Sequence, residues 1–319
     1  MTVICTGSIA YDYLMTFPGY FRDHILPDRL DSISLSFLVD SLTRQRGGTA
    51  PNIAYNLALL GEASLIVGTV GEDFGDYRRW LEEHNLDTRY IREVPDKFTA
   101  SFFANTDKAN NQICSFYTGA MANAGEISLD ELLPEHPELV IISPNDPGTM
   151  DQYVGECARL GLRYLYDPGQ QVARSSGAEL RRGVENAYSL FCNEYEFELL
   201  QKHTGLSREE MITRLNLLVV TLGEKGADIF SNGECTHTQV VPPQQIADPT
   251  GVGDAFRGGF IRAWNLGLDW STCGQVGALA ATYCLEHHGT QNHAYNIEEF
   301  IARYRQHFDD GGKLDRLLS

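Results

Sequence analysis

The chain has 319 residues, 43% of them hydrophobic, and a formal net charge of −18 at pH 7. This length exceeds the ~100 to 200 residues of a typical domain and is common for one large α/β domain with an appendage. Such an acidic protein repels polyanions, which argues against nucleic acid as a partner. A polyphosphate ligand would need a local positive site, a cation or both.

The seven cysteines are spread along the chain with no C-x-x-C pair, so neither a disulfide framework nor a zinc site is expected. No apolar run approaches the ~18 residues that a membrane span needs. The first residues lack the basic segment of an export signal. These features together favour a protein of the reducing cytoplasm.

An apolar run at residues 3–6 predicts a buried strand that ends before Gly7 and Ser8. Asp12 follows after a short polar turn. A carboxylate beyond the C-terminal end of a strand can hold a ligand in an α/β sheet, although a solvated loop is the commoner place for an aspartate. Residues 13–40 are expected to be irregular, except that SLSFLV at 34–39 alternates like a strand.

A glycine pair opens the next element, where residues 46–61 read RGGTAPNIAYNLALLG. Pro51 and Asn52 suit the first turn of a helix with one apolar side, and Gly61 would end it. The run SLIVGTVG at 64–71 then predicts a buried strand, and DFGDYRRWLEEHN predicts a second helix.

Residues 99–119, TASFFANTDKANNQICSFYTG, predict two strands joined by a polar turn. Phe102 and Phe116 alternate with polar neighbours in these strands. Most strand phenylalanines face a core, which is one interpretation of both residues.

From residue 138 onward, short apolar strands alternate with helices, which predicts a largely parallel sheet with helices on both faces. Strands are expected at 139–143, 162–167 and 187–193, and helices after Pro147 and near 177–184. Asp167 and the pair Gln170-Gln171 follow a strand, so they are expected at the same sheet edge as Ser8 and Asp12.

The segment that follows residue 192 begins with Asn193-Glu194-Tyr195-Glu196. One interpretation is an acidic helix start, which the helix dipole favours. LLVVTLGEKGADIF at 217–230 predicts a strand, a tight glycine turn and a second strand, and Asn232-Gly233 marks a further hairpin.

The stretch 248–260, DPTGVGDAFRGGF, carries the clearest functional signal. Asp248-Pro249 predicts a turn before a helix. Gly251 and Gly253 let the backbone approach a ligand, and the free N–H groups of the first helical turn form an anion site. Asp254 lies inside this site, and a general base beside a phosphate cradle indicates phosphoryl transfer to an alcohol. The alternative is a glycine turn with Asp254 as the helix N-cap.

The glycine-rich stretches at residues 46–61 and 248–260, in this order, resemble the two hallmarks of the ribokinase-like (PfkB) family of carbohydrate and nucleoside kinases. Residues 248–260 are similar to the family's anion-hole signature, with Val252 where a smaller residue is usual. Because a backbone N–H binds the anion, that departure concerns local packing. The sequence contains neither a Walker A motif nor G-x-G-x-x-G, so P-loop and Rossmann folds lack their defining motif.

The resemblance extends over nearly the whole chain and is nearest to adenosine kinases of the actinobacterial type, through GSIAYDYLMTFPGYF, SLSFLVDSL, CSFYTGAM and DPTGVGDAFR. It implies a three-layer α/β/α fold with a mostly parallel central sheet and a small β lid. The large domain would comprise residues 1–12, 46–97 and 119–319, and the lid residues 13–45 and 98–118.

The implied activity is ATP-dependent phosphorylation of the 5′-hydroxyl of adenosine to AMP, a step of purine salvage. Asp254 would be the catalytic base, and Gly251, Val252 and Gly253 the anion hole. The resemblance also implies two groups of binding residues: Ser8, Asp12, Ser36, Gly48, Asn52, Phe102, Phe116 and Gln171 for the nucleoside, with the two phenylalanines around the purine; and Asn193, Thr221 and Gly223 for the nucleotide.

Magnesium is the implied cofactor, with Glu196 ordering its water shell, and Mg²⁺ commonly keeps most of its waters in proteins. A potassium ion held near Asp248 and Thr250 is a further implied cofactor. A kinase for another nucleoside or for a sugar such as ribose or fructose remains the alternative, and a non-catalytic nucleoside-binding protein is a third class.

The predicted lid also suggests a homodimer. Its sheet would have one face over the substrate and the other exposing apolar side chains such as Phe37 or Phe103, which a second lid would cover. A membrane partner is not expected.

Overall fold

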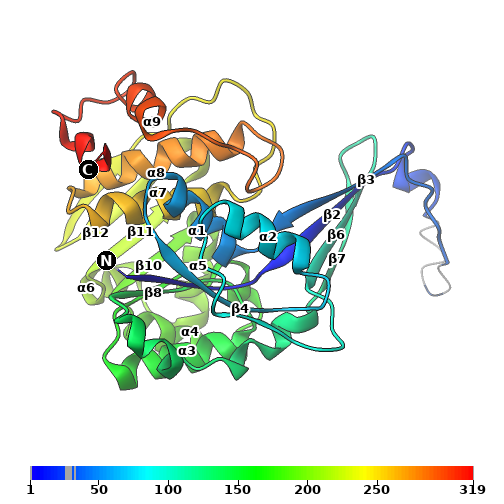
Figure 1. Cartoon of the computed structure of the whole chain (residues 1–319), viewed down its shortest axis with the longest axis horizontal. Coiled ribbons are helices and arrows are strands. Elements are labelled where there is room, and N and C mark those ends of the chain that lie inside the picture. Colours follow the sequence, from blue (N-terminus) through cyan, green and yellow to red (C-terminus); the bar gives the residue numbers. More distant parts are fainter. Residues whose placement is uncertain (1, 26–30, 32–33, 319) are drawn as a thin grey trace.

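The computed structural model describes residues 2–25, 31 and 34–318, and shows an α/β body from which a small β-sheet projects (Figure 1). The body is built on one sheet with strand order β13-β12-β11-β10-β9-β8-β1-β4-β5. These strands are Val3–Thr6 (β1), Ser64–Val70 (β4), Ile91–Glu93 (β5), Leu139–Ile142 (β8), Tyr164–Tyr166 (β9), Ser189–Asn193 (β10), Leu217–Thr221 (β11), Ala227–Ser231 (β12) and Glu234–Thr238 (β13). Neighbours from β5 to β11 pair in parallel, whereas β12 is antiparallel to both β11 and β13.

Helices cover both faces of this sheet. One face carries Thr49–Leu59 (α1), Gly75–Glu83 (α2), Val252–Asn265 (α7), Trp270–Leu285 (α8) and Ile297–Tyr304 (α9). The other carries Pro147–Leu160 (α3), Gly177–Glu185 (α4), Glu194–Thr204 (α5) and Arg208–Arg214 (α6). The predicted three-layer α/β/α fold with a mostly parallel central sheet is therefore confirmed.

Both faces of the central strands are buried, as expected for a parallel sheet with helices on each side. In β1, Val3 and Cys5 pack into the core under α1 and α7, while Ile4 between them packs into the core under α3. In β11, Leu217 and Val219 face the first core, and Leu218 faces the second. This two-sided burial explains the continuous apolar runs from which the strands were predicted.

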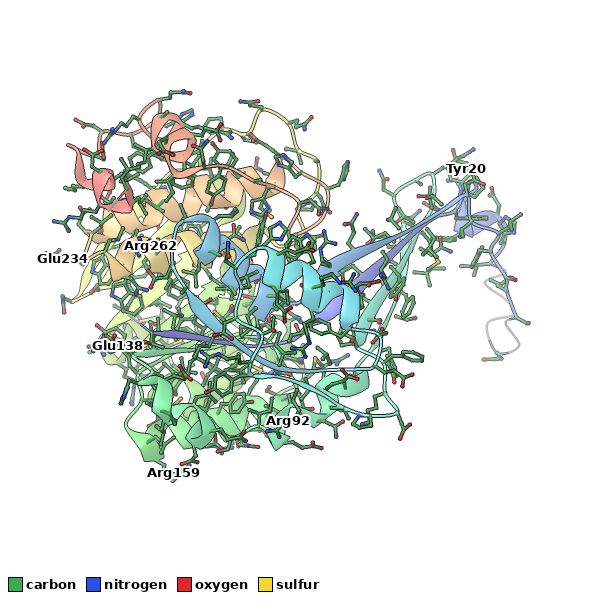
Figure 2. All side chains as sticks on the ribbon, in the orientation of Figure 1. Tyr20, Arg92, Glu138, Arg159, Glu234 and Arg262 are labelled. Atoms are coloured by element: carbon green, nitrogen blue, oxygen red, sulfur yellow. The ribbon has the colours of Figure 1, made fainter. Side chains whose placement is uncertain are left out.

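The projecting sheet, called the lid below, has strand order β3-β2-β6-β7. Its strands are Ala10–Thr16 (β2), Ser41–Gly47 (β3), Ala100–Thr106 (β6) and Gln112–Tyr117 (β7). The predicted hairpin is confirmed as β6 and β7. Figure 2 shows Tyr20, which follows β2, at the far tip of the lid.

Two predictions in the lid region were wrong. Strand β2 contains Asp12 and extends to Thr16, into the segment from residue 13 that was expected to be irregular. Residues 34–39 form no strand, and the strand begins at Ser41 instead. The alternation at 34–39 reflects a different contact, because Phe37 packs edge-on against Phe17 and Phe21. Strand β3 is mostly polar and forms through its seven registered pairs with β2, a pairing that local hydrophobicity does not reveal.

None of the helices in the described ranges is long and apolar enough to cross a membrane. All seven cysteines lie in the described ranges and are free.

Candidate active site

A cavity of about 170 Å³ lies at the C-terminal ends of β9, β10 and β11, beside the start of α7. This is the sheet edge where α/β proteins bind ligands. Five residues predicted from separate parts of the sequence line it together: Asn193, Glu196, Thr221, Gly253 and Asp254. The sheet has thus brought the expected nucleotide, magnesium and catalytic residues to one place.

The first turn of α7 has the geometry of an anion site. Helix α7 begins at Val252, and Gly251 is its N-cap with a φ of +76°. A Cβ at Gly251 would come within 2.7 Å of the Thr290 side chain, so glycine is required both by the backbone angle and by the close packing. The N–H groups of Val252 and Gly253 belong to this first turn, where no preceding helical carbonyl accepts them. Gly253 itself lines the cavity.

Asp254 is the third residue of α7 and accepts a hydrogen bond of 2.8 Å from Asn52 Nδ2. Burial raises the pKa of Asp254 to about 7, although the nearby Arg257 and the Asn52 hydrogen bond act in the opposite direction. A base with a pKa near neutrality is well matched to proton transfer. The alternative of Asp254 as a simple N-cap is wrong, because Gly251 occupies that position.

Arg257 is a site residue that the sequence reasoning missed. Its side chain is buried, Nη1 donates to the Gly253 carbonyl at 2.8 Å, and Nη2 donates to Asp167 Oδ1 at 2.8 Å. Burial opposes the charge of Arg257, but Asp167 outweighs this effect and raises the arginine pKa. The available signal was an arginine three residues after Asp254, on the buried side of a predicted helix.

Glu196 and Asn193 form a reciprocal capping box at the start of α5. The Asn193 N–H donates to Glu196 Oε2 at 2.9 Å, and the Glu196 N–H donates to Asn193 Oδ1 at 2.8 Å. Glu196 is therefore part of an acidic helix start and also lines the cavity. Burial and the nearby Asp167 raise the pKa of Glu196.

The donor set suits magnesium bound through water. Among the described residues, no group of three or more His, Cys, Asp and Glu side chains could enclose a metal ion. Glu196 and Asp167 nevertheless line the cavity, and Mg²⁺ is usually held by one or two carboxylates together with substrate phosphates and waters. Glu196, the residue predicted to order a magnesium water shell, is thus one of the carboxylates that line the cavity.

Asp12 and Gly48 lie at the junction of lid and body. Burial and the nearby Asp248 raise the pKa of Asp12 to about 6. Gly48 has a φ of +98°, and a Cβ there would come within 2.4 Å of the Ser8 carbonyl oxygen. The glycine pair thus lets α1 start directly against the end of β1, which places Asn52 beside Asp254.

Three other residues that were predicted to bind the nucleoside, Ser8, Gln171 and Ser36, differ in their surroundings. Ser8 Oγ accepts the Thr49 N–H at 3.2 Å and so helps to start α1. Gln171 is buried, and its Nε2 donates to the Asn145 carbonyl at 2.6 Å. Ser36 is exposed in the segment before β3, beside Phe37, and no contact within the described ranges joins it to the other predicted residues.

Phe102 and Phe116 are paired directly across β6 and β7, and Asp12 pairs with Phe102 across β2 and β6. Directly opposed residues share one face of a sheet, so both rings lie on the same face as Asp12. Phe116 is 40% exposed. The interpretation that both rings fill a lid core does not fit Phe116, whose strand is exposed throughout.

The residues of the predicted potassium site are occupied with backbone contacts. Asp248 accepts the Thr250 N–H at 2.9 Å and the Gly289 N–H at 3.1 Å, which ties the turn before α7 to the segment after α8.

Gly223, which was predicted to bind the nucleotide, lies just beyond β11. It has a φ of +61° and open space around it.

Comparison with known proteins places these features in a family. Residues 13–296 match the pfkB family of carbohydrate kinases. A nucleoside kinase of Methanocaldococcus jannaschii is 28% identical over 310 residues, 96% of this chain and 97% of the relative.

Solved structures are similar over the same extent. The nucleoside kinase of Burkholderia thailandensis in complex with inosine has a TM-score of 0.87 at 36% identity, over 97% of this chain and 99% of that one. Its complex with ADP-inosine has a TM-score of 0.84 at 39% identity, over 97% and 96% of the two chains. A Methanocaldococcus jannaschii nucleoside kinase, described as an archaeal member of the ribokinase family, has a TM-score of 0.86 at 27% identity over 96% and 98%.

Proposed function

The chain belongs to the pfkB family of carbohydrate kinases, and we propose that it transfers the γ-phosphoryl group of ATP to the 5′-hydroxyl of a purine nucleoside, with adenosine as the preferred acceptor. The observation that carries this proposal is the position of Asp254. Its carboxylate, with a pKa of about 7, lies in the first turn of α7, and Gly253 from the same turn lines the same cavity. A base and an anion site together suit transfer of a phosphoryl group to a hydroxyl.

In the proposed reaction, Asp254 accepts the proton of the 5′-hydroxyl as that oxygen attacks the γ-phosphorus, and the bond from the γ-phosphorus to the β–γ bridging oxygen breaks to release ADP. The N–H groups at Gly251, Val252 and Gly253 stabilise charge on the transferred phosphoryl oxygens. Asn193, Thr221 and Gly223 are proposed to contact the nucleotide. Magnesium, when bound, supplies positive charge to the phosphates, and Glu196 would hold its water shell.

The acceptor is proposed to be a nucleoside because of the lid. Phe102 and Phe116 lie side by side on the face of the lid that carries Asp12. Aromatic faces bind a purine by stacking, whereas ribose or fructose alone would gain little from them. Asp12, Gly48 and Asn52 are proposed to bind the ribose, and Ser8, Ser36 and Gln171 to line the rest of the site.

Inosine is a second candidate acceptor, favoured by the inosine complexes of the Burkholderia thailandensis enzyme. Adenine and hypoxanthine share the stacking surface and differ at the base edge. One site could therefore accept both adenosine and inosine as substrates.

The test is a coupled ADP-release assay with MgATP and a panel of adenosine, inosine, other nucleosides, ribose and fructose, with Asp254→Asn as the control. The proposal expects kcat/KM for adenosine to exceed that for ribose by about ten- to a hundredfold, since stacking contributes ~1 to 3 kcal/mol per base. Faster turnover of ribose or fructose would contradict the nucleoside assignment. ADP release no higher than in the control would support a non-catalytic binding protein. Repeating the assay with and without KCl tests the potassium site at Asp248 and Thr250.

We also propose a homodimer through the lid. Leu42, Phe103 and Ile113 lie on the lid face opposite to Asp12 and are 61%, 37% and 43% exposed. Tyr13 stacks on Phe103 at 4.9 Å on this outer face. Phe37 is not part of it, because Phe37 packs against Phe17 and Phe21. A second lid would cover the apolar patch formed by Tyr13, Leu42, Phe103 and Ile113.

A further inference from the structure

A chain of buried hydrogen bonds runs from the backbone of β3 to Asp254. The Tyr77 hydroxyl donates to the Gly47 carbonyl at 3.0 Å. Gln291 Nε2 lies 2.6 Å from the Tyr77 oxygen and 2.7 Å from Asn52 Oδ1. Asn52 Nδ2 in turn lies 2.8 Å from Asp254 Oδ2. These residues come from β3, α2, the segment after α8, α1 and α7.

The direction of every bond in this chain follows from the Gly47 carbonyl, which can only accept. Because Tyr77 gives its one proton to that carbonyl, its oxygen can only accept from Gln291. Gln291 must therefore present its NH₂ group, whose second N–H needs an acceptor. Asn52 meets that need with its carbonyl oxygen, and its own NH₂ group is left facing Asp254.

The surroundings leave little freedom to reverse this order. Asn52, Tyr77 and Gln291 are at most 3% exposed, so water cannot supply substitute partners. The Thr290 hydroxyl lies 2.8 Å from Asn52 Oδ1 and 3.0 Å from the Arg46 carbonyl oxygen, so these two acceptors share its single proton. A reversed chain would take the tyrosine proton away from the buried Gly47 carbonyl, which is unfavourable.

We propose that Gln291, anchored by Tyr77, is a positioning residue that holds the Asn52 side-chain amide with its N–H toward Asp254. An N–H suits an ionised carboxylate, which only accepts hydrogen bonds. A flipped amide would place its carbonyl oxygen against the carboxylate, and only a protonated Asp254 could donate to it. The chain therefore favours the form of Asp254 that can accept a proton. This inference rests on the proposed function, which assigns that role to Asp254.

Several charged or titratable groups also face Asp254, and they remain in place when Gln291 is changed. Arg257 from α7 lowers the pKa of Asp254, while Asp167 after β9 and Asp12 from the lid raise it. Cys284 from α8 interacts with Asp254 as well, and burial keeps its thiol protonated with a pKa of about 12. A change in the pH dependence of a Gln291 variant would therefore report on the Asn52 amide.

The test compares Gln291→Met, which keeps side-chain length but removes the donor, with wild type over pH 5 to 9. For Gln291→Met, the midpoint of the pH dependence of kcat/KM is expected to rise by about one pH unit, and turnover below the midpoint to fall about tenfold. Tyr77→Phe should move the midpoint in the same direction by less, since Gln291 can still donate to Asn52.

Tyr55→Phe is the matched control, because the Tyr55 hydroxyl donates to the His293 carbonyl in the same segment without contacting Asn52. It should leave the midpoint at the wild-type value. A wild-type midpoint in both Gln291→Met and Tyr77→Phe would overturn the inference, as would an equal shift in Tyr55→Phe.

A substrate-free measurement separates this inference from the proposed function. If the pKa of Asp254 rises in Gln291→Met, its Tm should fall more between pH 5 and pH 8 than that of wild type, by about 2 °C. Wild type that phosphorylates no nucleoside would defeat the proposed function, while the Tm comparison would still decide the role of Gln291. Equal Tm changes in the variant and wild type would refute that role.

Discussion

Replacing Asp254 with asparagine keeps the shape of the side chain but removes both a base and a buried charge. Two opposite effects are expected. Turnover should fall by ~10² to 10⁴, the usual contribution of a general base. The ligand-free protein should become more stable at alkaline pH, because burial raises the pKa of Asp254 from 3.8 to about 7 and ionisation there is unfavourable.

The pH window follows from these two pKa values. Between pH 3.8 and about 7 the folded protein holds a proton that the unfolded chain has lost, so stability falls as pH rises and the loss is complete above about 7. From pH 5 to pH 8 this loss is about 3 kcal/mol at ~1.4 kcal/mol per pKa unit. Asp254 is partly exposed at the cavity, and screening by water reduces the figure to about 1 to 2 kcal/mol. Asp254→Asn has no carboxyl group at this position, so its stability does not fall with pH for this reason.

The assay is thermal unfolding of both ligand-free proteins at pH 5 and pH 8. The advantage of Asp254→Asn in Tm should grow by about 2 to 4 °C between the two pH values, at about 2 °C per kcal/mol for a chain of this size. All other titrating groups are common to both proteins, so their effects cancel to first order. A Tm difference that stays constant or shrinks would refute the buried-charge argument. Turnover above about a tenth of wild type would refute the role as base.

Phe116→Ala should weaken adenosine binding roughly ten- to a hundredfold with little change in Tm, because the ring is exposed on the Asp12 face of the lid; an unchanged Kd with a much lower Tm would contradict this. Arg257→Met should destabilise the protein by about 3 to 5 kcal/mol because it leaves Asp167 buried without its cation, and adding Asp167→Asn should recover part of the loss; no recovery would argue against the pair. Light scattering at micromolar concentration should give a dimer for wild type and a monomer for Phe103→Glu, and a monomeric wild type would defeat the lid interface.

The parts of the site that could be predicted from sequence are those where the backbone itself demands a residue type. Gly48 and Gly251 have φ values of +98° and +76°, and a Cβ at either would meet neighbouring atoms within 2.7 Å or less. Such positions tolerate almost nothing but glycine, so a functional backbone geometry leaves a visible pattern. The buried strands were predictable for a related reason, because burial on both faces requires an unbroken apolar run.

The lid was predicted less well because strand pairing, and not an unbroken apolar run, determines where its strand β3 forms. Strand β3 has the sequence SLTRQRG and is mostly exposed, so its hydrophobicity resembles that of a loop. Its conformation comes from pairing with β2, and pairing between distant segments is not encoded in either segment alone. Residues 34–39 show the converse error, since alternation there comes from Phe37 packing on an aromatic cluster instead of from a pleated strand.

The residues around Asp254 that escaped prediction are polar side chains defined by their partners. Gln291 is separated from Asn52 by 239 positions and from Tyr77 by 214, and nothing in the local sequence distinguishes it from a surface glutamine. Arg257 is likewise an ordinary helical arginine until Asp167 is placed beside it. A buried polar group is stable only when its hydrogen bonds are satisfied, so its role depends on residues that the fold assembles. Sequence patterns can therefore reveal where a reaction takes place, whereas the protonation and orientation of its base depend on contacts that exist only in the folded chain.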